Sequence, residues 1–92
     1  MADQVRSEIR VAKLSHPCMA THWFEQSGLG QQDLDPVEWA SVLHARSANG
    51  QIEPGQQYLY QVNRDSENAL VVFKARLEMN AICRRYGLYP ES

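Results

Sequence analysis

The sequence predicts a mainly α fold, a small single-domain bundle of about four helices over residues 1–92. Three observations indicate it. The chain carries complete start and stop signals for a helix near residues 36–48. An apolar stripe at helical spacing runs from Leu70 to Ile82. The chain has 92 residues, 43% of them hydrophobic, which is enough for one modest core and not for a second domain.

The helix near residues 36–48 has the strongest local signals. Asp35 is a good N-cap, Pro36 suits the first helical position, and Glu38 is spaced to complete a capping box. Asn49 and Gly50 supply the stop. We therefore expect a helix with both ends defined by local chemistry.

The preceding part of the chain is less strongly patterned. Ser15 can cap a helix that Pro17 helps to start, and Gly28 or Gly30 would end it. Residues 4–14 fit a helix face and, more loosely, the alternation of a strand. The sequence leaves that segment open.

Residues 58–86 pose the main structural choice. We expect a short helix around Tyr58, followed by a long helix that Asp65 or Ser66 caps and Gly87 ends. The alternative is an α+β fold with a hairpin near residues 58–73 packed on helices, because β-branched and aromatic residues are frequent there. We favour helices because a strand would have to turn into a helix near Arg76 without a cap.

Neither the cysteines nor the histidines predict a metal site. Cys18 and Cys83 are the only cysteines and are expected to be reduced and buried. His16, Cys18 and His22 lie close together in the sequence, with Cys83 as a fourth candidate ligand. Their spacing matches no common zinc pattern, so we expect no metal.

The sequence contains no recognisable catalytic motif. It lacks a glycine-rich phosphate loop, a Gly-x-Ser-x-Gly elbow and a His-Glu-x-x-His run. We expect no enzymatic activity and no cofactor. No apolar run approaches the roughly 18 residues of a membrane span, and the N-terminus is too charged for a signal peptide. A cytoplasmic protein without membrane association is expected.

Charge is unevenly distributed along the chain, although the formal net charge is only −2. Residues 15–63 carry five carboxylates against Arg46, a balance of −4. Residues 74–85 carry four cations against Glu78, a balance of +3. This segregation favours a protein partner or a nucleoprotein assembly over naked nucleic acid.

The basic C-terminal segment is the predicted binding site. Exposed tyrosines beside arginines are typical of protein interfaces. The predicted binding residues are Arg84, Arg85, Tyr86 and Tyr89, with Lys74 and Arg76 in a secondary role.

Two partial resemblances concern this same segment. Residues 80–87, with the basic pair Arg84 and Arg85 and a helix-ending Gly87, resemble the first helix and turn of a helix-turn-helix in transposases and regulators. Only residues 88–92 follow, with Pro90 among them, so we expect no recognition helix. Residues 68–91, in particular Tyr86-Gly87-Leu88-Tyr89-Pro90, are also similar to the C-terminal tail of small terminase subunits of tailed phages.

The sequence thus predicts a small non-enzymatic interaction protein, an adaptor or inhibitor of the kind that phages and mobile elements encode. It would dock on a larger protein or nucleoprotein complex. The alternative is a nucleic-acid-associated regulator or DNA-packaging factor that uses the basic C-terminal helix. A homodimer is left open.

Overall fold

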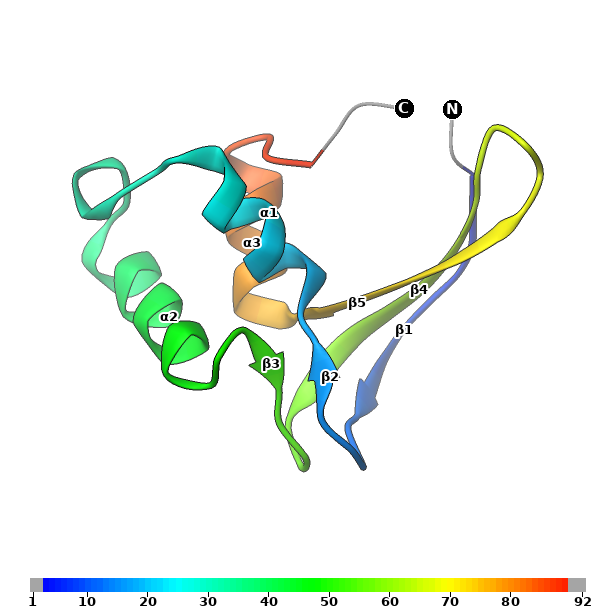
Figure 1. The fold of residues 1–92 in the computed structure, drawn as a ribbon, viewed down its shortest axis with the longest axis horizontal. Coiled ribbons are helices and arrows are strands. Elements are labelled where there is room, and N and C mark those ends of the chain that lie inside the picture. Colours follow the sequence, from blue (N-terminus) through cyan, green and yellow to red (C-terminus); the bar gives the residue numbers. More distant parts are fainter. Residues whose placement is uncertain (1–2, 90–92) are drawn as a thin grey trace.

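The fold is α+β, which corrects the expectation of a mainly α helical bundle. The computed structural model describes residues 3–89. Within that range three α-helices hold 30 residues and the strands hold 28, so neither class dominates. The helices gather at one end of the molecule, and a long antiparallel sheet extends away from them (Figure 1).

The elements follow one another in a mixed order. Their bounds are β1 Asp3–Val11, β2 His16–Pro17, α1 Met19–Ser27, a 3₁₀ turn Gln31–Asp33, α2 Pro36–Ser47, β3 Gln51–Ile52, β4 Gln57–Arg64, β5 Leu70–Arg76 and α3 Leu77–Arg85. The larger sheet has the strand order β1-β4-β5 and is antiparallel throughout. β2 and β3 form a second, two-stranded antiparallel sheet. The N-terminal segment that the sequence left open is the edge strand β1.

The hairpin of β4 and β5 takes the place of the short helix and of the first half of the long helix, as the α+β alternative with a hairpin near residues 58–73 predicted. Asp65, expected as a helix cap, instead organises the turn between the strands. Its backbone N–H donates to the Ala69 carbonyl, and its Oδ1 accepts from the N–H groups of Glu67 and Ala69, each at 2.9 Å. Asn68 adopts a left-handed conformation with φ of 67°. Short Asp side chains favour such turns as much as helix caps, so the same residue supports either structure.

The apolar stripe from Leu70 to Ile82 is divided between a strand and a helix. β5 ends at Arg76 and α3 begins at Leu77, and no side chain caps the helix. Tertiary contacts hold the junction, because the Arg76 N–H donates to the Cys18 Sγ at 3.2 Å. The expected need for a local cap was therefore wrong.

The first two helices bear out most of their local signals. α2 has Asp35 as N-cap, Pro36 in the first turn and a capping box with Glu38, as predicted. α1 begins later than expected, because Cys18 rather than Ser15 caps it, while Gly28 ends it with φ of 78° as expected.

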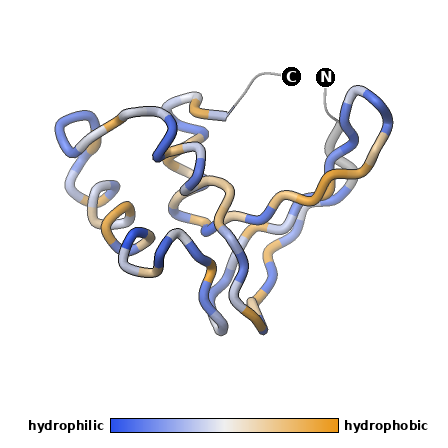
Figure 2. Tube along the Cα trace, viewed as in Figure 1, coloured by the Kyte–Doolittle hydropathy of each residue, from blue (hydrophilic) through white to orange (hydrophobic). Residues whose placement is uncertain are grey.

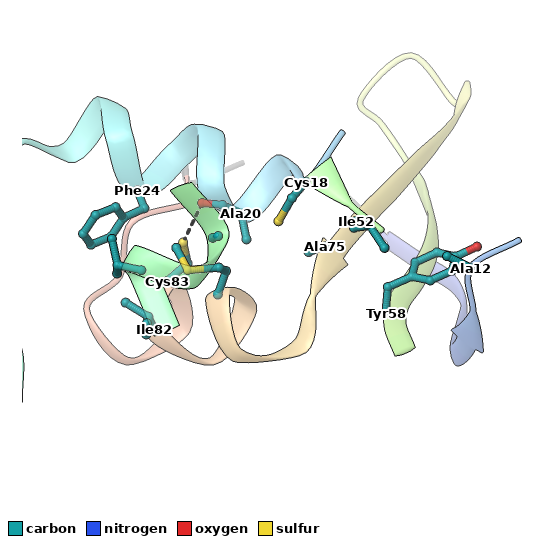
Figure 3. Close-up of a cluster of buried hydrophobic side chains, with 12 residues drawn as sticks. Ala12, Cys18, Ala20, Phe24, Ile52, Tyr58, Ala75, Ile82 and Cys83 are labelled. Atoms are coloured by element: carbon teal, nitrogen blue, oxygen red, sulfur yellow. Dashed lines mark hydrogen bonds between the residues drawn. The ribbon is translucent and has the colours of Figure 1, made fainter. Parts of the chain in front are cut away.

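The core lies where α1, α2 and α3 meet the inner end of the larger sheet and the short β2–β3 sheet (Figure 3). Its buried apolar residues are Ala12, Cys18, Ala20, Phe24, Val42, Ala45, Ile52, Tyr58, Ala75, Met79, Ile82 and Cys83. The Cys83 Sγ–H donates to the Ala20 carbonyl at 3.2 Å, and burial raises the pKa of this thiol to about 11. Both cysteines are free and buried, as expected. The outer half of the sheet contributes little to this core.

Candidate functional site

The residues predicted as one binding site are separated in the structure. Arg76 is fully buried, with Nη1 donating to the Gln51 carbonyl at 2.9 Å and Nε to the Glu78 carboxylate at 3.1 Å. Its side chain joins β5, β3 and α3, so it belongs to the interior and offers no surface for a partner.

Arg85 and Tyr86 contact the acidic start of α2. The Arg85 Nη1 lies 2.8 Å from Glu38 Oε2, and the Tyr86 hydroxyl donates to Glu38 Oε1 at 2.8 Å. Burial alone would raise the pKa of Glu38, but hydrogen bonds from the Asp35 N–H, Tyr86 and Arg85 lower it below its usual value. The two charged segments that the sequence separated therefore pair within one molecule.

Tyr89 and Arg84 lie in different environments. The Tyr89 hydroxyl donates to Asn80 Oδ1 at 2.6 Å, and its ring meets the Phe73 ring edge to face at 5.4 Å. Burial raises the pKa of Tyr89. Arg84 is exposed and forms no ion pair with any residue in the range 3–89. Among the predicted binding residues on the C-terminal helix, Arg84 therefore has a charge that no carboxylate of the described range neutralises.

The structure bears on the helix-turn-helix resemblance only at the end of the first helix, where Gly87 was expected to terminate it. Gly87 follows α3 with φ of 64°, and the Leu88 N–H donates to the Cys83 carbonyl at 2.9 Å, which is the longer hydrogen bond of a Schellman motif. Gly87 thus ends the helix as predicted. Pro90 lies outside the described residues.

Lys74 lies on the larger sheet, two residues before the buried Arg76 and away from Arg84 and Arg85 on α3. Antiparallel partners share a face, so the registers Glu8–Tyr60–Lys74 and Arg6–Val62–Val72 place these side chains together. The same face carries Arg10 beside Tyr58, and Arg64 beside Leu70. We call it the cationic face, defined by Arg6, Arg10, Arg64, Lys74 and the ring of Tyr60.

The aromatic ring of Tyr60 is the centre of the cationic face. The Arg10 guanidinium carbon lies 3.7 Å from its centroid, and the Lys74 Nζ lies 6.0 Å from it. Glu8 contributes a carboxylate, which forms an ion pair with Arg10. Such cation–π contacts fix the long side chains against the sheet.

An open depression of about 550 Å³ lies at the inner end of the cationic face. We call it the cationic groove, and its lining includes Arg10, Lys13, Leu14, His16, Tyr58 and Lys74. The Tyr58 ring is 5% exposed and packs at 5.7 Å against the His16 ring, so the groove has a rigid aromatic wall. Sequence reasoning missed this groove, because residues 4–14 were left open and residues 58–62 were assigned to a helix.

The outer half of the β4–β5 hairpin, residues 61–73, forms an arm that projects beyond the helices (Figure 1). Its β5 side is hydrophobic in Figure 2. Leu70, Val71 and Val72 are 61%, 44% and 44% exposed, so three consecutive apolar side chains face solvent. β-branched residues in the run 70–73 were noted in the sequence, but only as a possible strand.

A second depression, of about 390 Å³, lies between α1 and the end of α2. Thr21 and His22 line it together with the ion pair between Glu25 and Arg46, whose Nη2–Oε1 distance is 2.8 Å. The Thr21 hydroxyl is buried and makes no hydrogen bond in the structure. No three His, Cys, Asp or Glu side chains within residues 3–89 are placed to hold a metal ion together.

Comparison with known proteins adds no relative. No protein-family model, curated protein or solved structure matches this chain. The resemblances to helix-turn-helix and terminase segments therefore stay predictions. In the part of the chain that the structure describes, every helix is too short or too polar to cross a membrane.

Proposed function

We propose that this protein is a small interaction protein, an adaptor or inhibitor, that docks on a larger protein complex through the free edge of β5. The observation that carries the proposal is the solvent-exposed apolar run Leu70-Val71-Val72 on an edge strand. Folded proteins usually protect such edges with lysine, proline, a bulge or a covering element. Here Lys74 is the first charged side chain of β5.

The hairpin geometry decides which backbone groups are open to a partner. The Asp65 N–H donates to the Ala69 carbonyl. This bond fixes which residues of β5 form backbone hydrogen bonds with β4 and which direct their backbone groups away from it. It follows that Val71 and Phe73 bond toward β4, whereas Leu70, Val72 and Lys74 direct their N–H and C=O groups outward.

The inner end of the strand supports this alternation. Arg76 is the next residue of the outward series, and its N–H donates to the Cys18 Sγ at the start of α1. The open stretch of the edge therefore covers Leu70 to Lys74 and stops where the helices begin. A stretch of this length suits strand addition, in which main-chain hydrogen bonds give affinity and side chains on alternate faces give selectivity.

The surrounding charges indicate which partner segment would fit. Lys74, Arg64 and Arg6 share the cationic face, while Val71 and Phe73 lie on the opposite face of the sheet. An extended segment that alternates acidic and apolar side chains would match both faces. We therefore assign the edge to a partner protein that offers such a segment.

Selection from a library of extended peptides tests this proposal. Binders should alternate apolar and acidic residues, and hydrogen exchange at the amides of Leu70, Val72 and Lys74 should slow when they bind. Val72→Pro removes an outward N–H without touching the β4 ladder, and should weaken binding at least about 10-fold.

A matched control distinguishes strand addition from non-specific hydrophobic binding. Val37 is 77% exposed near the start of α2, so Val37→Lys removes a similar apolar surface elsewhere and should leave binding unchanged. The proposal is wrong if bound peptides leave the three outward amides unprotected. Concentration-dependent dimerisation that Val72→Pro abolishes would instead assign the edge to a second copy of the chain.

A further inference from the structure

We infer that the cationic groove binds the phosphate backbone of single-stranded nucleic acid. This site shares the Lys74 side chain with the inner end of the β5 edge, and it is distinct from the C-terminal helix where the sequence placed a possible nucleic-acid contact. Its cations come from β1, the following loop and β5. The inference therefore depends on the tertiary fold and is independent of the protein partner proposed above.

The groove holds positive charge that carboxylates within residues 3–89 do not neutralise. Lys13 is exposed, and neither Lys13 nor Lys74 has a described carboxylate within ion-pair distance. Glu8 is nearby, but its carboxylate is bound to Arg10. A bound anion would supply a negatively charged partner to both lysines.

Lys74 and His16 form the most specific part of the groove. The Lys74 Nζ lies 3.4 Å from His16 Nδ1, and both side chains are only partly exposed. His16 packs against the Tyr58 ring, and the Lys74 Nζ lies 6.0 Å from the centroid of the Tyr60 ring. His16 Nδ1 accepts from the Lys74 ammonium and thereby positions it, and the ammonium keeps further protons to donate to a phosphate oxygen.

The cationic face continues the positive charge of the groove along β1, as the binding of an extended polyanion requires. Arg6 lies four residues before Arg10 on β1, about 13 Å along the strand, and Val62 separates it from β5. A single small anion would need no such continuation. Positive charge spaced along a sheet suits a ligand with repeated phosphates.

The Arg10–Tyr60 stack favours an unpaired strand over a duplex. The guanidinium plane lies over the ring at 3.7 Å, and its other side can accept a base by stacking. Duplex bases are already stacked and cannot use such a platform. Backbone contacts by Lys13 and Lys74 carry no base identity, so binding should be largely independent of sequence.

The expected strength follows from the number of cations. Arg10 is paired with Glu8, so contacts from Lys13 and Lys74 would neutralise about two phosphates, which gives a slope of about −1.4 for log K against log salt on a single strand. Affinity should then fall about 7-fold between about 50 and 200 mM salt. The overall charge of −2 keeps non-specific binding elsewhere on the surface weak.

Fluorescence anisotropy with a labelled oligothymidylate of about 20 nucleotides tests the inference on the full-length chain. The double variant Lys13→Gln/Lys74→Gln should weaken binding at low salt at least about 10-fold and bring the slope close to zero. Lys13→Gln alone should reduce the slope by about 0.7, and this exposed position should not affect folding.

Arg84→Gln is the matched control, because Arg84 is an exposed cation on α3 that forms no ion pair with a residue of the described range. It removes the same charge and should leave both affinity and slope unchanged. The inference is overturned if Arg84→Gln weakens binding as much as Lys13→Gln does. It is also overturned if a duplex or poly-glutamate competes as well as the single strand, or if the oligonucleotide does not bind at low salt.

Discussion

Arg76→Ala should destabilise the protein strongly, although the sequence marks this residue as a surface cation. The Arg76 side chain is fully buried. It connects the β5–α3 junction to the carbonyl of Gln51 on β3 and to Glu78 in the first turn of α3. The substitution leaves a buried carbonyl without a donor and a space beneath the helix.

The size of the effect follows from these contacts. The hydrogen bond from the charged Nη1 to the Gln51 carbonyl contributes about 1.5–3 kcal/mol. The Glu78 carboxylate is 33% exposed, so its ion pair adds at most about 1 kcal/mol. The lost packing increases the cost, while Nη2 is buried without an acceptor and its removal relieves about 1 kcal/mol or more. We expect a net loss of about 3 kcal/mol.

Urea denaturation, followed by the fluorescence of Trp23 and Trp39, measures this loss. A chain of 92 residues has a free energy of unfolding of roughly 5–14 kcal/mol, so the variant should still fold at low temperature. Arg76→Met fills most of the space without the orphaned nitrogen, and should lose about 1 kcal/mol less than Arg76→Ala. Arg84→Ala, at an exposed position, should change stability by less than about 0.5 kcal/mol. A loss below about 1 kcal/mol for Arg76→Ala would refute the reasoning.

Three further predictions concern helix ends and the buried thiol. Asp35→Ala removes the N-cap of α2 and should lower the free energy of unfolding by about 1 kcal/mol, measured in urea; an unchanged midpoint would contradict this role. Gly87→Ala meets no atom within 4 Å, so its cost of about 1 kcal/mol should come from the left-handed backbone alone, and a stabilised variant would disprove that. Burial raises the pKa of Cys83 to about 11 from the usual 9.0, so stability should fall as the pH rises from about 9 towards 11. Cys83 should also resist alkylation at pH 8 until urea unfolds the chain, and rapid labelling of the native protein would count against its burial.

The two proposed surfaces divide binding between a protein and a nucleic acid. The β5 edge offers backbone groups and apolar side chains, whereas the cationic groove offers charge and an aromatic wall. A protein with both could join a nucleoprotein complex while contacting each component separately. Val72→Pro and Lys13→Gln test the surfaces independently, because Val72 lies on the arm and Lys13 lies beyond the inner end of β1.

The sequence alone determined those elements whose signals are local. Asp35, Pro36 and Glu38 act within one turn of each other, so α2 and its capping box follow from chemistry that needs no distant partner. Gly28 and Gly87 likewise end their helices because each adopts a backbone conformation that suits glycine.

Only the tertiary structure decided the C-terminal half and the candidate sites. Residues 70–76 become a strand because β4 pairs with them, and Arg76 becomes a structural residue because Cys18 and Gln51, distant in sequence, meet it there. The charge balance of separate segments could not show that Arg85 would pair with Glu38, 47 residues earlier. Partners that depend on chain folding leave no periodic pattern in the sequence. The β-branched and aromatic residues of 58–73 therefore indicated the hairpin only as the alternative to helices, and the cationic groove was missed.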